Sequence, residues 1–139
     1  MKRKIDHSFE NRARILGLNH LMGYDHCRLG YYLFEKKLYD GSKIEFLKSV
    51  KINPKLGEAW LGLAKIAQHT GEIIERDNAL QKALSCKSKS PSSLYRLAVF
   101  FEEISGIEIE KELLKKVVLL DSDGEWGREA RKRLTILSP

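Results

Sequence analysis

The sequence is poor in proline and cysteine. Only three of its 139 residues are proline, and because proline interrupts the hydrogen bonding of a helix, this scarcity favours a helical chain. The two cysteines, Cys27 and Cys86, lie far apart, and neither belongs to a CxxC pair. A disulfide framework or a zinc finger is therefore not indicated, and reduced thiols in the cytoplasm are expected.

Long apolar runs are also missing. No window of the sequence approaches the roughly 20 apolar residues that span a bilayer. The basic start, residues 1–6, is not followed by the apolar run of a secretory signal. The sequence therefore predicts a cytoplasmic protein with no membrane partner.

The length and composition suit one domain, residues 1–139. Hydrophobic residues make up 42% of the chain and charged residues 32%, which excludes a disordered or collagen-like protein. A net charge of +6 would suit nucleic acid or anionic lipid as a partner, so the distribution of the basic residues has to decide.

Three segments superpose without gaps at a spacing of 34 residues: 23–56, 57–90 and 91–124. In their first halves the matching residues are His26, Trp60 and Leu94; Leu29, Leu63 and Leu97; Gly30, Ala64 and Ala98; and Leu33, Ala67 and Phe101. In their second halves they are Phe46, Leu80 and Leu114; Ser49, Ala83 and Val117; and Val50, Leu84 and Val118. These sets recur at helical spacing, so each segment is predicted to be a pair of amphipathic helices.

Turn residues fall between the predicted helices. Pro54 ends the first segment, Pro91 opens the third, and Gly71 and Gly106 lie near the turns within pairs. The helices are predicted at residues 24–37, 40–52, 57–70, 73–86, 91–104 and 107–120. Two further helices, 8–22 and 125–137, are expected to cap the ends, because terminal repeats need a polar outer surface.

Residues 23–124 resemble the tetratricopeptide-repeat (TPR) family. The second unit carries Trp60, Leu63 and Ala64 at the family's Trp-x-x-Leu-small spacing, and it ends in the run Lys82-Ala83-Leu84. The resemblance implies an all-α fold, an α-solenoid of three TPR-type helix pairs with N-terminal and C-terminal capping helices.

One position departs from the family pattern. Early in the second helix of each pair the family has a small residue, and here the matching residues are Ser42, Arg76 and Glu110. A long charged side chain at this position is expected either to extend outwards or to hold the two helices slightly apart.

Nothing in the sequence indicates catalysis or a cofactor. There is no glycine-rich phosphate loop, HExxH motif, nucleophile elbow or isolated pair of carboxylates. The four histidines, His7, His20, His26 and His69, lack metal-ligand spacing. We therefore predict no enzyme, no metal site and no cofactor, and interpret His26 as a residue at the edge of the core in place of an aromatic one.

The resemblance also implies a binding surface, since the first helix of each pair lines the concave side in this family. The predicted peptide-binding groove consists of Tyr24, Cys27, Tyr31, Phe34, Leu61, Lys65, Gln68, Tyr95, Val99 and Glu102, with Glu58 and Ser92 on the same face. Its tyrosines have no structural role in the repeat pattern, and tyrosine is frequent at binding hot spots. The alternative is that they pack against a terminal helix folded into the groove.

We predict a protein-interaction adaptor that binds an apolar or aromatic peptide, or a helix, of another protein. Lys65 is the only basic residue of the groove, so capture of a chaperone's C-terminal carboxylate, which some family members perform, is not predicted. One alternative is a secretion chaperone, because class II type III secretion chaperones share this plan. The other is RNA binding by Trp126 with the basic cluster Arg128, Arg131, Lys132 and Arg133, although acidic residues interrupt the basic ones along the chain.

Overall fold

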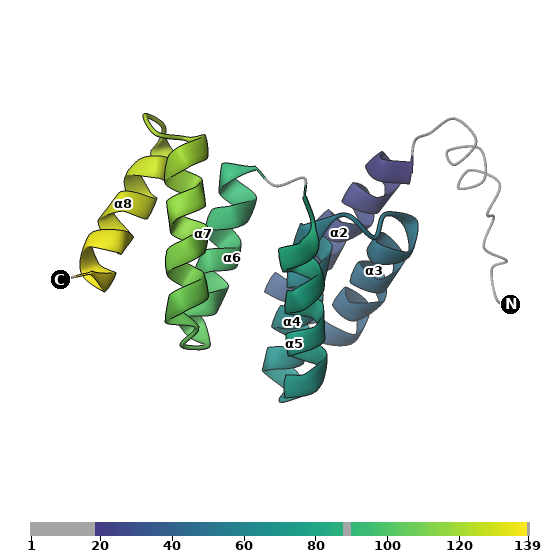
Figure 1. Cartoon of the computed structure of the whole chain (residues 1–139). Coiled ribbons are helices and arrows are strands. Elements are labelled where there is room, and N and C mark those ends of the chain that lie inside the picture. The colour runs from purple at the N-terminus through teal and green to yellow at the C-terminus, as the bar shows by residue number, and fades with distance from the viewer. Residues whose placement is uncertain (1–18, 88–89, 139) are drawn as a thin grey trace, which may run out of the picture. The chain divides into compact units, whose positions relative to one another are not determined.

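The structure, a computed structural model, describes residues 19–87 and 90–138, and all regular elements among these residues are helices (Figure 1). The helices are α2 (Asn19–Glu35), α3 (Tyr39–Ile52), α4 (Gly57–Thr70), α5 (Ile73–Ser85), α6 (Pro91–Glu103), α7 (Ile107–Leu120) and α8 (Glu125–Leu137). The chain divides into two compact units between residues 87 and 88. Helices α2 to α5 belong to unit 1 and α6 to α8 to unit 2, and the single domain expected for residues 1–139 stays a prediction.

The helix bounds confirm the predicted helix pairs. Helices α3 to α7 each begin and end within one residue of the predicted range, and α8 covers the predicted 125–137. Residues 8–18 of the predicted N-terminal helix lie outside the described residues. Its last part, residues 19–22, is continuous with α2.

The break expected at Gly23 is wrong. This residue is buried within α2, and Ser49 Oγ of α3 donates a 2.6 Å hydrogen bond to its backbone carbonyl. The low helix propensity of glycine is therefore overridden by close packing between two helices.

The core of unit 1 is built around the ring of Phe46, on α3. This side chain is fully buried, and it lies between Gly30 on α2 and Gly62 on α4. A Cβ atom added to Gly30 would lie 2.7 Å from the ring, and one added to Gly62 would lie closer still. Ser42, one turn earlier on α3, donates a 2.6 Å hydrogen bond to the carbonyl of Gly30. Three helices thus meet at one aromatic ring.

The helix ends follow the turn residues. α4 ends at Gly71, whose φ of 80° lies in the left-handed region that glycine adopts without strain. α6 begins with Pro91 at a first-turn position, and the Ser90 hydroxyl accepts a hydrogen bond from the backbone N–H of Ser93. These local signals explain why the predicted bounds are accurate.

Unit 2 consists of the pair α6 and α7 with α8 packed against it. The buried residues of the pair are Leu94, Leu97, Ala98, Phe100, Phe101, Glu110, Leu113, Leu114 and Val117. A Cβ atom on Gly127 of α8 would overlap the carbonyl oxygen of Asp121. The Asp121 carboxylate accepts hydrogen bonds from the backbone N–H groups of Trp126 and Gly127 at 3.1 and 3.3 Å. Asp121 therefore satisfies two of the N–H groups that the first turn of α8 leaves unpaired.

Most of the predicted core positions are buried, with an exception in the first helix. The sets that begin with Gly30, Phe46 and Ser49 are buried in all three repeats. Leu29, which the repeat pattern placed in the core, is 43% exposed. Among the described helices α2 packs only against α3 and α4, so nothing in the described part covers the side that carries Leu29.

The position expected to hold a small residue behaves differently in each pair. Ser42 bonds to a neighbouring helix, as described above. Arg76 reaches exposed partners, since its Nη1 donates a 2.6 Å hydrogen bond to Gln68 Oε1, in line with the expected outward direction. Glu110 is buried, so of the two expected outcomes, outward extension does not occur in the third repeat.

We predict that Gly62→Ala lowers the free energy of unfolding of unit 1 by about 1–3 kcal/mol, because the added methyl group overpacks the Phe46 ring. The sequence has two tryptophans, so Trp126→Phe leaves Trp60 as the reporter of unit 1. Urea unfolding followed by Trp60 fluorescence measures the loss.

Gly41→Ala is the matched control. A Cβ atom at this position would meet only Leu33 Cδ1, at an ordinary 3.5 Å, so the variant is expected to be at least as stable as its parent. If Gly62→Ala proved as stable as Gly41→Ala, the role assigned to the Phe46 ring would be incorrect.

Candidate functional site

The predicted groove residues of unit 1 differ in exposure. On α2, Tyr24 is 41% exposed, while Tyr31 and Phe34 are half-buried. On α4, Lys65 is half-buried and Gln68 is exposed. These five residues, which the prediction assigns to one groove, are called the α2–α4 face.

Cys27 and Leu61, which match each other in the repeat, are core residues. They are 1% and 2% exposed, and Cys27 belongs to the apolar cluster around Phe46. They lie on α2 and α4, which contact each other, so this position is closed off from solvent. This corrects their assignment to the groove.

Tyr31 has a structural role that the repeat pattern did not indicate. Its ring packs edge-on against Phe46, with the centroids 4.9 Å apart, and its hydroxyl donates a 2.6 Å hydrogen bond to the backbone carbonyl of Glu58 on α4. The ammonium group of Lys65 lies 5.4 Å from the ring centroid, within the range of a cation–π interaction. Tyr31 therefore links α2 to α4, and only part of its ring is left for a partner.

Phe34 belongs to a second cluster of aromatic rings in unit 1. Its ring packs edge-on against Tyr39 of α3 at 5.5 Å, and Tyr39 stacks on His69 of α4 at 3.9 Å. Tyr39 matches Ile73 and Ile107 at the repeat spacing, but the sequence does not show that its ring contacts Phe34 and His69, so neither Tyr39 nor His69 was predicted to be part of this group.

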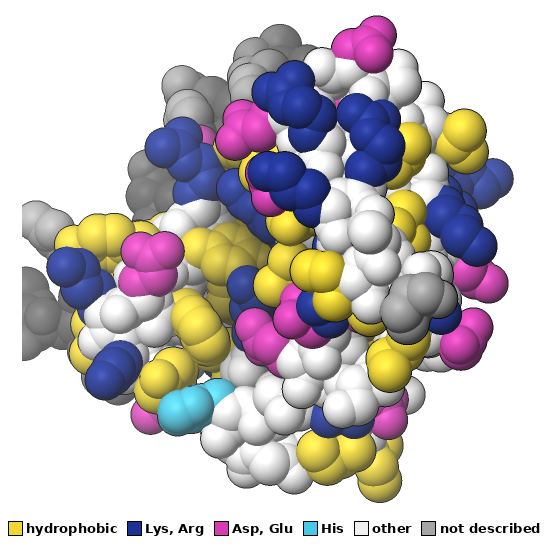
Figure 2. All heavy atoms as spheres, turned by 90° about the vertical axis from the view of Figure 1, so that its left-hand side faces the viewer, with side chains coloured by type: hydrophobic (Ala, Val, Ile, Leu, Met, Phe, Trp, Pro, Cys, Tyr) yellow, Lys and Arg dark blue, Asp and Glu magenta, His cyan; other side chains and the backbone are white. Residues whose placement is uncertain are grey.

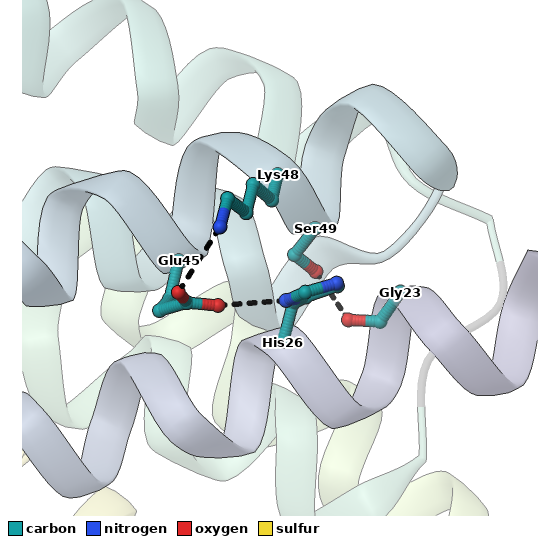
Figure 3. Close-up of polar contacts among 5 residues, drawn as sticks. All are labelled: Gly23, His26, Glu45, Lys48 and Ser49. Carbon is teal, nitrogen blue, oxygen red and sulfur yellow. Dashed lines mark hydrogen bonds and ion pairs between the residues drawn. The ribbon is translucent and has the colours of Figure 1, made fainter. Parts of the chain in front are cut away.

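His26 replaces an aromatic residue by making a polar contact with the second helix of its pair. Figure 3 shows its Nδ1 atom directed at Glu45 of α3, 2.6 Å from Oε2, with Lys48 Nζ 3.5 Å from the other carboxylate oxygen. In the second repeat the matching residues Trp60 and Lys82 contact each other directly, with the ammonium group 4.4 Å from the ring centroid. His26 thus lies at the edge of the core, as predicted.

In unit 2 two of the predicted groove residues contact α8. Tyr95 packs on Trp126, with the ring centroids 5.5 Å apart, and Glu102 pairs with Arg133 at 3.3 Å. Val99 is partly exposed. The alternative in which the groove tyrosines pack against a terminal helix therefore holds for Tyr95, whereas Glu102 stays exposed beside its partner Arg133.

A buried ion pair fixes α8 to the helix pair. Glu110 of α7 is 1% exposed, and its Oε2 atom accepts a 2.9 Å hydrogen bond from Arg133 Nε. This hydrogen bond is the main reason why the pKa of Arg133 is raised. The other carboxylate oxygen, Oε1, has no hydrogen-bond partner among the described residues. Because a buried charge is costly without its counter-ion, Arg133 is the residue that makes the position of Glu110 tolerable.

α8 continues the 34-residue period. Helices α4, α6 and α8 begin at residues 57, 91 and 125, so α8 takes the place of the first helix of a further repeat. Arg133 matches Lys65 and Val99 in this register. The sequence contains this signal, although α8 was predicted only to cap the end of the repeats.

The described residues give no indication of a membrane span or a metal site. No helix in this part of the chain combines the length and the apolar character that crossing a bilayer requires. Within the same residues, no group of three His, Cys, Asp or Glu side chains is placed to hold a metal ion. Figure 2 shows the face that carries α8, on which Lys and Arg side chains gather with Asp and Glu side chains among them. This mixture differs from the continuous basic groove that binds single-stranded nucleic acid.

Comparison with known proteins identifies the class of fold. No protein-family model and no curated protein sequence matches the chain. Among solved structures it resembles the first TPR domain of human RPAP3, with a TM-score of 0.63 and 14% identity over 86% of this chain and 91% of that one. It also resembles the first TPR of Spaghetti (RPAP3) bound to the HSP90 peptide SRMEEVD, with a TM-score of 0.60 and 15% identity over 86% and 95% of the two chains.

A third similar structure is that of pilF from Pseudomonas aeruginosa, with a TM-score of 0.61 and 21% identity. It matches 72% of this chain, which spans 45% of the pilF chain. The paired helices and their constant period define a helical-repeat protein. Together with these structures, they confirm the predicted resemblance: the chain has the tetratricopeptide-repeat fold.

Arg133→Ala is expected to destabilise unit 2 and loosen α8, because it leaves the buried Glu110 carboxylate without a cation. Trp126 lies on α8, so its fluorescence during urea unfolding, in a Trp60→Phe background, reports the change. Adding Glu110→Gln to Arg133→Ala is expected to restore part of the stability, since the stranded charge is then removed.

Arg131→Ala, on the same helix, is the control, because Arg131 is exposed and makes no ion pair with the described residues. If the Arg133→Ala and Arg131→Ala variants had the same free energy of unfolding, the ion pair would not be what fixes α8.

Tyr95 is predicted to make unit 2 sensitive to alkaline pH. Burial is the main cause that raises its pKa above the ordinary 10.0, followed by the charges of Glu129 and Glu102. Between pH 10.0 and the raised pKa of the folded chain, the Tyr95 hydroxyl is ionised in the unfolded chain and still protonated in the folded chain. The stabilising contribution is therefore complete below pH 10.0 and is lost as the pH rises through the folded pKa.

The measurement is urea unfolding of unit 2 at increasing pH, with tyrosinate absorbance as a second readout. Compared with Tyr95→Phe, the parent should lose stability more steeply at alkaline pH. Identical pH profiles for the two proteins would contradict the prediction.

Proposed function

We propose that the protein is a cytoplasmic, non-catalytic interaction module that binds a peptide segment or a helix of another protein at the α2–α4 face. The aromatic composition of this face carries the proposal. Tyr24, Tyr31 and Phe34 lie on one side of α2 at spacings of seven and three residues. Aromatic side chains supply large contact areas with little loss of conformational freedom, and binding hot spots are rich in them.

The exposure of Tyr24 supports a role in binding. It makes no ring contact, hydrogen bond or ion pair with the described residues, although it is 41% exposed. Tyr31 and Phe34 are half-buried, so they add an apolar floor next to it. A partner residue that packs against Tyr24 would therefore extend an aromatic surface that the protein already holds in place.

Lys65 gives the α2–α4 face a positive charge that can select between partner segments. Its ammonium group lies over the Tyr31 ring, where it can attract a carboxylate or a backbone carbonyl of the partner. The face has one lysine among aromatic residues, which suits an apolar or aromatic segment better than a strongly acidic one. The peptide-bound TPR of Spaghetti (RPAP3) supports a polypeptide ligand for this fold, but fold alone does not define a ligand.

Among the predicted groove residues of unit 2, Val99 is partly exposed. Tyr95 and Glu102 are engaged by α8, so they are not offered to a partner in this arrangement. RNA binding is not proposed, because Arg133 pairs with Glu102 and Glu110 and Lys132 pairs with Glu129. Half of the basic cluster is thus neutralised within unit 2.

The experiment is affinity capture from an extract of the source organism, with the parent beside a Tyr24→Ala, Lys65→Glu double variant. The variant is expected to bind the recovered partner at least tenfold more weakly in calorimetry, a loss of about 1.4 kcal/mol. Tyr31 is left intact because its substitution would also disturb the core.

Tyr32→Ala is the matched control. Tyr32 is exposed on α2 next to Tyr31, but successive helical residues point in different directions, so its loss should leave binding unchanged. If the double variant and Tyr32→Ala recover the same partners with the same affinity, the α2–α4 face is not the binding surface.

A further inference from the structure

A pocket of about 200 Å³ opens in unit 1 between α3, α4 and α5. It is called the α3–α5 pocket here. Trp60, Leu63 and Ala67 of α4 line it, together with Leu47 of α3 and Ala79 of α5. Leu47 is 48% exposed, so the apolar lining continues onto the surface.

The pocket lies on a different side of α4 from the α2–α4 face. Trp60, Leu63 and Ala67 follow one another at spacings of three and four residues and therefore share one side of the helix. Lys65 and Gln68 point to other sides and do not line the pocket. The other pocket walls come from α3 and α5, the second helices of their pairs. A ligand here would occupy a surface that the proposed function does not use.

The carboxylates at the rim of the pocket already have partners. Glu75 pairs with Lys43, which lies across the pocket on α3, at 3.6 Å. Glu72 accepts a 3.0 Å hydrogen bond from the Thr70 hydroxyl. Lys43 balances the charge of Glu75, whereas Glu72 keeps its negative charge, because the hydroxyl that donates to it is neutral.

The lysines at the opposite end are not neutralised. Lys82, which lines the pocket, rests over the Trp60 ring at 4.4 Å. Lys51 lies one turn beyond Leu47 on α3 and is exposed. Within the described residues, neither lysine forms an ion pair with a carboxylate.

The two lysines lie at the same end of the pocket. Successive helices of unit 1 are antiparallel neighbours, so α3 and α5 run in the same direction. The Lys43–Glu75 ion pair shows which residues of the two helices lie opposite each other, and Lys51 and Lys82 follow eight and seven residues after its two members. An apolar cavity with a cationic end results.

We propose that the α3–α5 pocket is a second docking site, which takes an acidic amphipathic segment of a partner protein. One large apolar side chain of this segment enters the pocket beside Trp60 and Leu47. A carboxylate of the segment, about one helical turn away, pairs with Lys82 or Lys51. The apolar contact provides affinity, and the charge pairing sets the orientation and excludes basic segments.

The probes are three short synthetic peptides of the same length: one with a central leucine flanked by glutamates, one with lysines replacing the glutamates, and one with serine replacing the leucine. Trp60 lines the pocket, so its fluorescence in a Trp126→Phe background reports binding directly. The acidic leucine peptide is expected to bind at least tenfold more tightly than either of the others.

The variants Leu47→Asp and Lys51→Glu are each expected to weaken the acidic leucine peptide at least tenfold. Lys51 is exposed and does not pack on Trp60, so its substitution tests the charge pairing without disturbing the pocket wall. A Lys51→Glu, Lys82→Glu double variant is expected to prefer the lysine peptide, a reversal that a folding defect would not produce. Circular dichroism and urea unfolding confirm that each variant folds.

The Tyr24→Ala, Lys65→Glu variant separates this proposal from the first one, because it should bind the acidic leucine peptide as the parent does. The α3–α5 pocket is excluded as a docking site if no peptide changes Trp60 fluorescence or if all three bind equally. It is also excluded if binding is lost in the Tyr24→Ala, Lys65→Glu variant and kept in Leu47→Asp.

Discussion

The close approach of three helices to the Phe46 ring is the constraint on which unit 1 depends. Gly30 and Gly62 leave room for the ring only because they have no side chains. At this spacing the Tyr31 hydroxyl reaches the carbonyl of Glu58, which fixes the α2–α4 face. The same ring lies between α3 and α4, two of the three helices that line the α3–α5 pocket. One core contact therefore joins the helices that carry both proposed binding surfaces.

The repeat pattern determines the position of a side chain on its helix, but it does not determine which residues that side chain contacts. His26 and Trp60 match in the repeat, yet the first binds a carboxylate and the second rests under an ammonium group. Likewise Ser42 bonds to a backbone carbonyl, whereas Glu110 binds an arginine. Each position has its own polar partner, although Oε1 of Glu110 lacks one among the described residues, so a period of 34 residues tolerates very different chemistry.

This distinction explains what the sequence could and could not predict. Helix bounds depend on local signals, such as Gly71 and Pro91, and the apolar period, so they were predicted to within one residue from α3 onwards. Whether a residue of a helix face is open depends on how closely the next helix approaches. Cys27 and Leu61 were therefore assigned to the groove although the contact between α2 and α4 buries them. The hydroxyl bond of Tyr31 could not be predicted either, because it depends on that same interhelical distance.

The attachment of α8 follows a different principle from the core of unit 1. Its fully buried residues are Gly127 and Ala130, which have little apolar area to remove from water. Burial of such small side chains gives a helix close contact but little preference for one position over another. The Glu110–Arg133 ion pair supplies that preference, because a buried carboxylate tolerates only arrangements that keep its cation in place. We infer that charge pairing and close backbone approach act together with the Trp126–Tyr95 ring contact to define how α8 covers Tyr95.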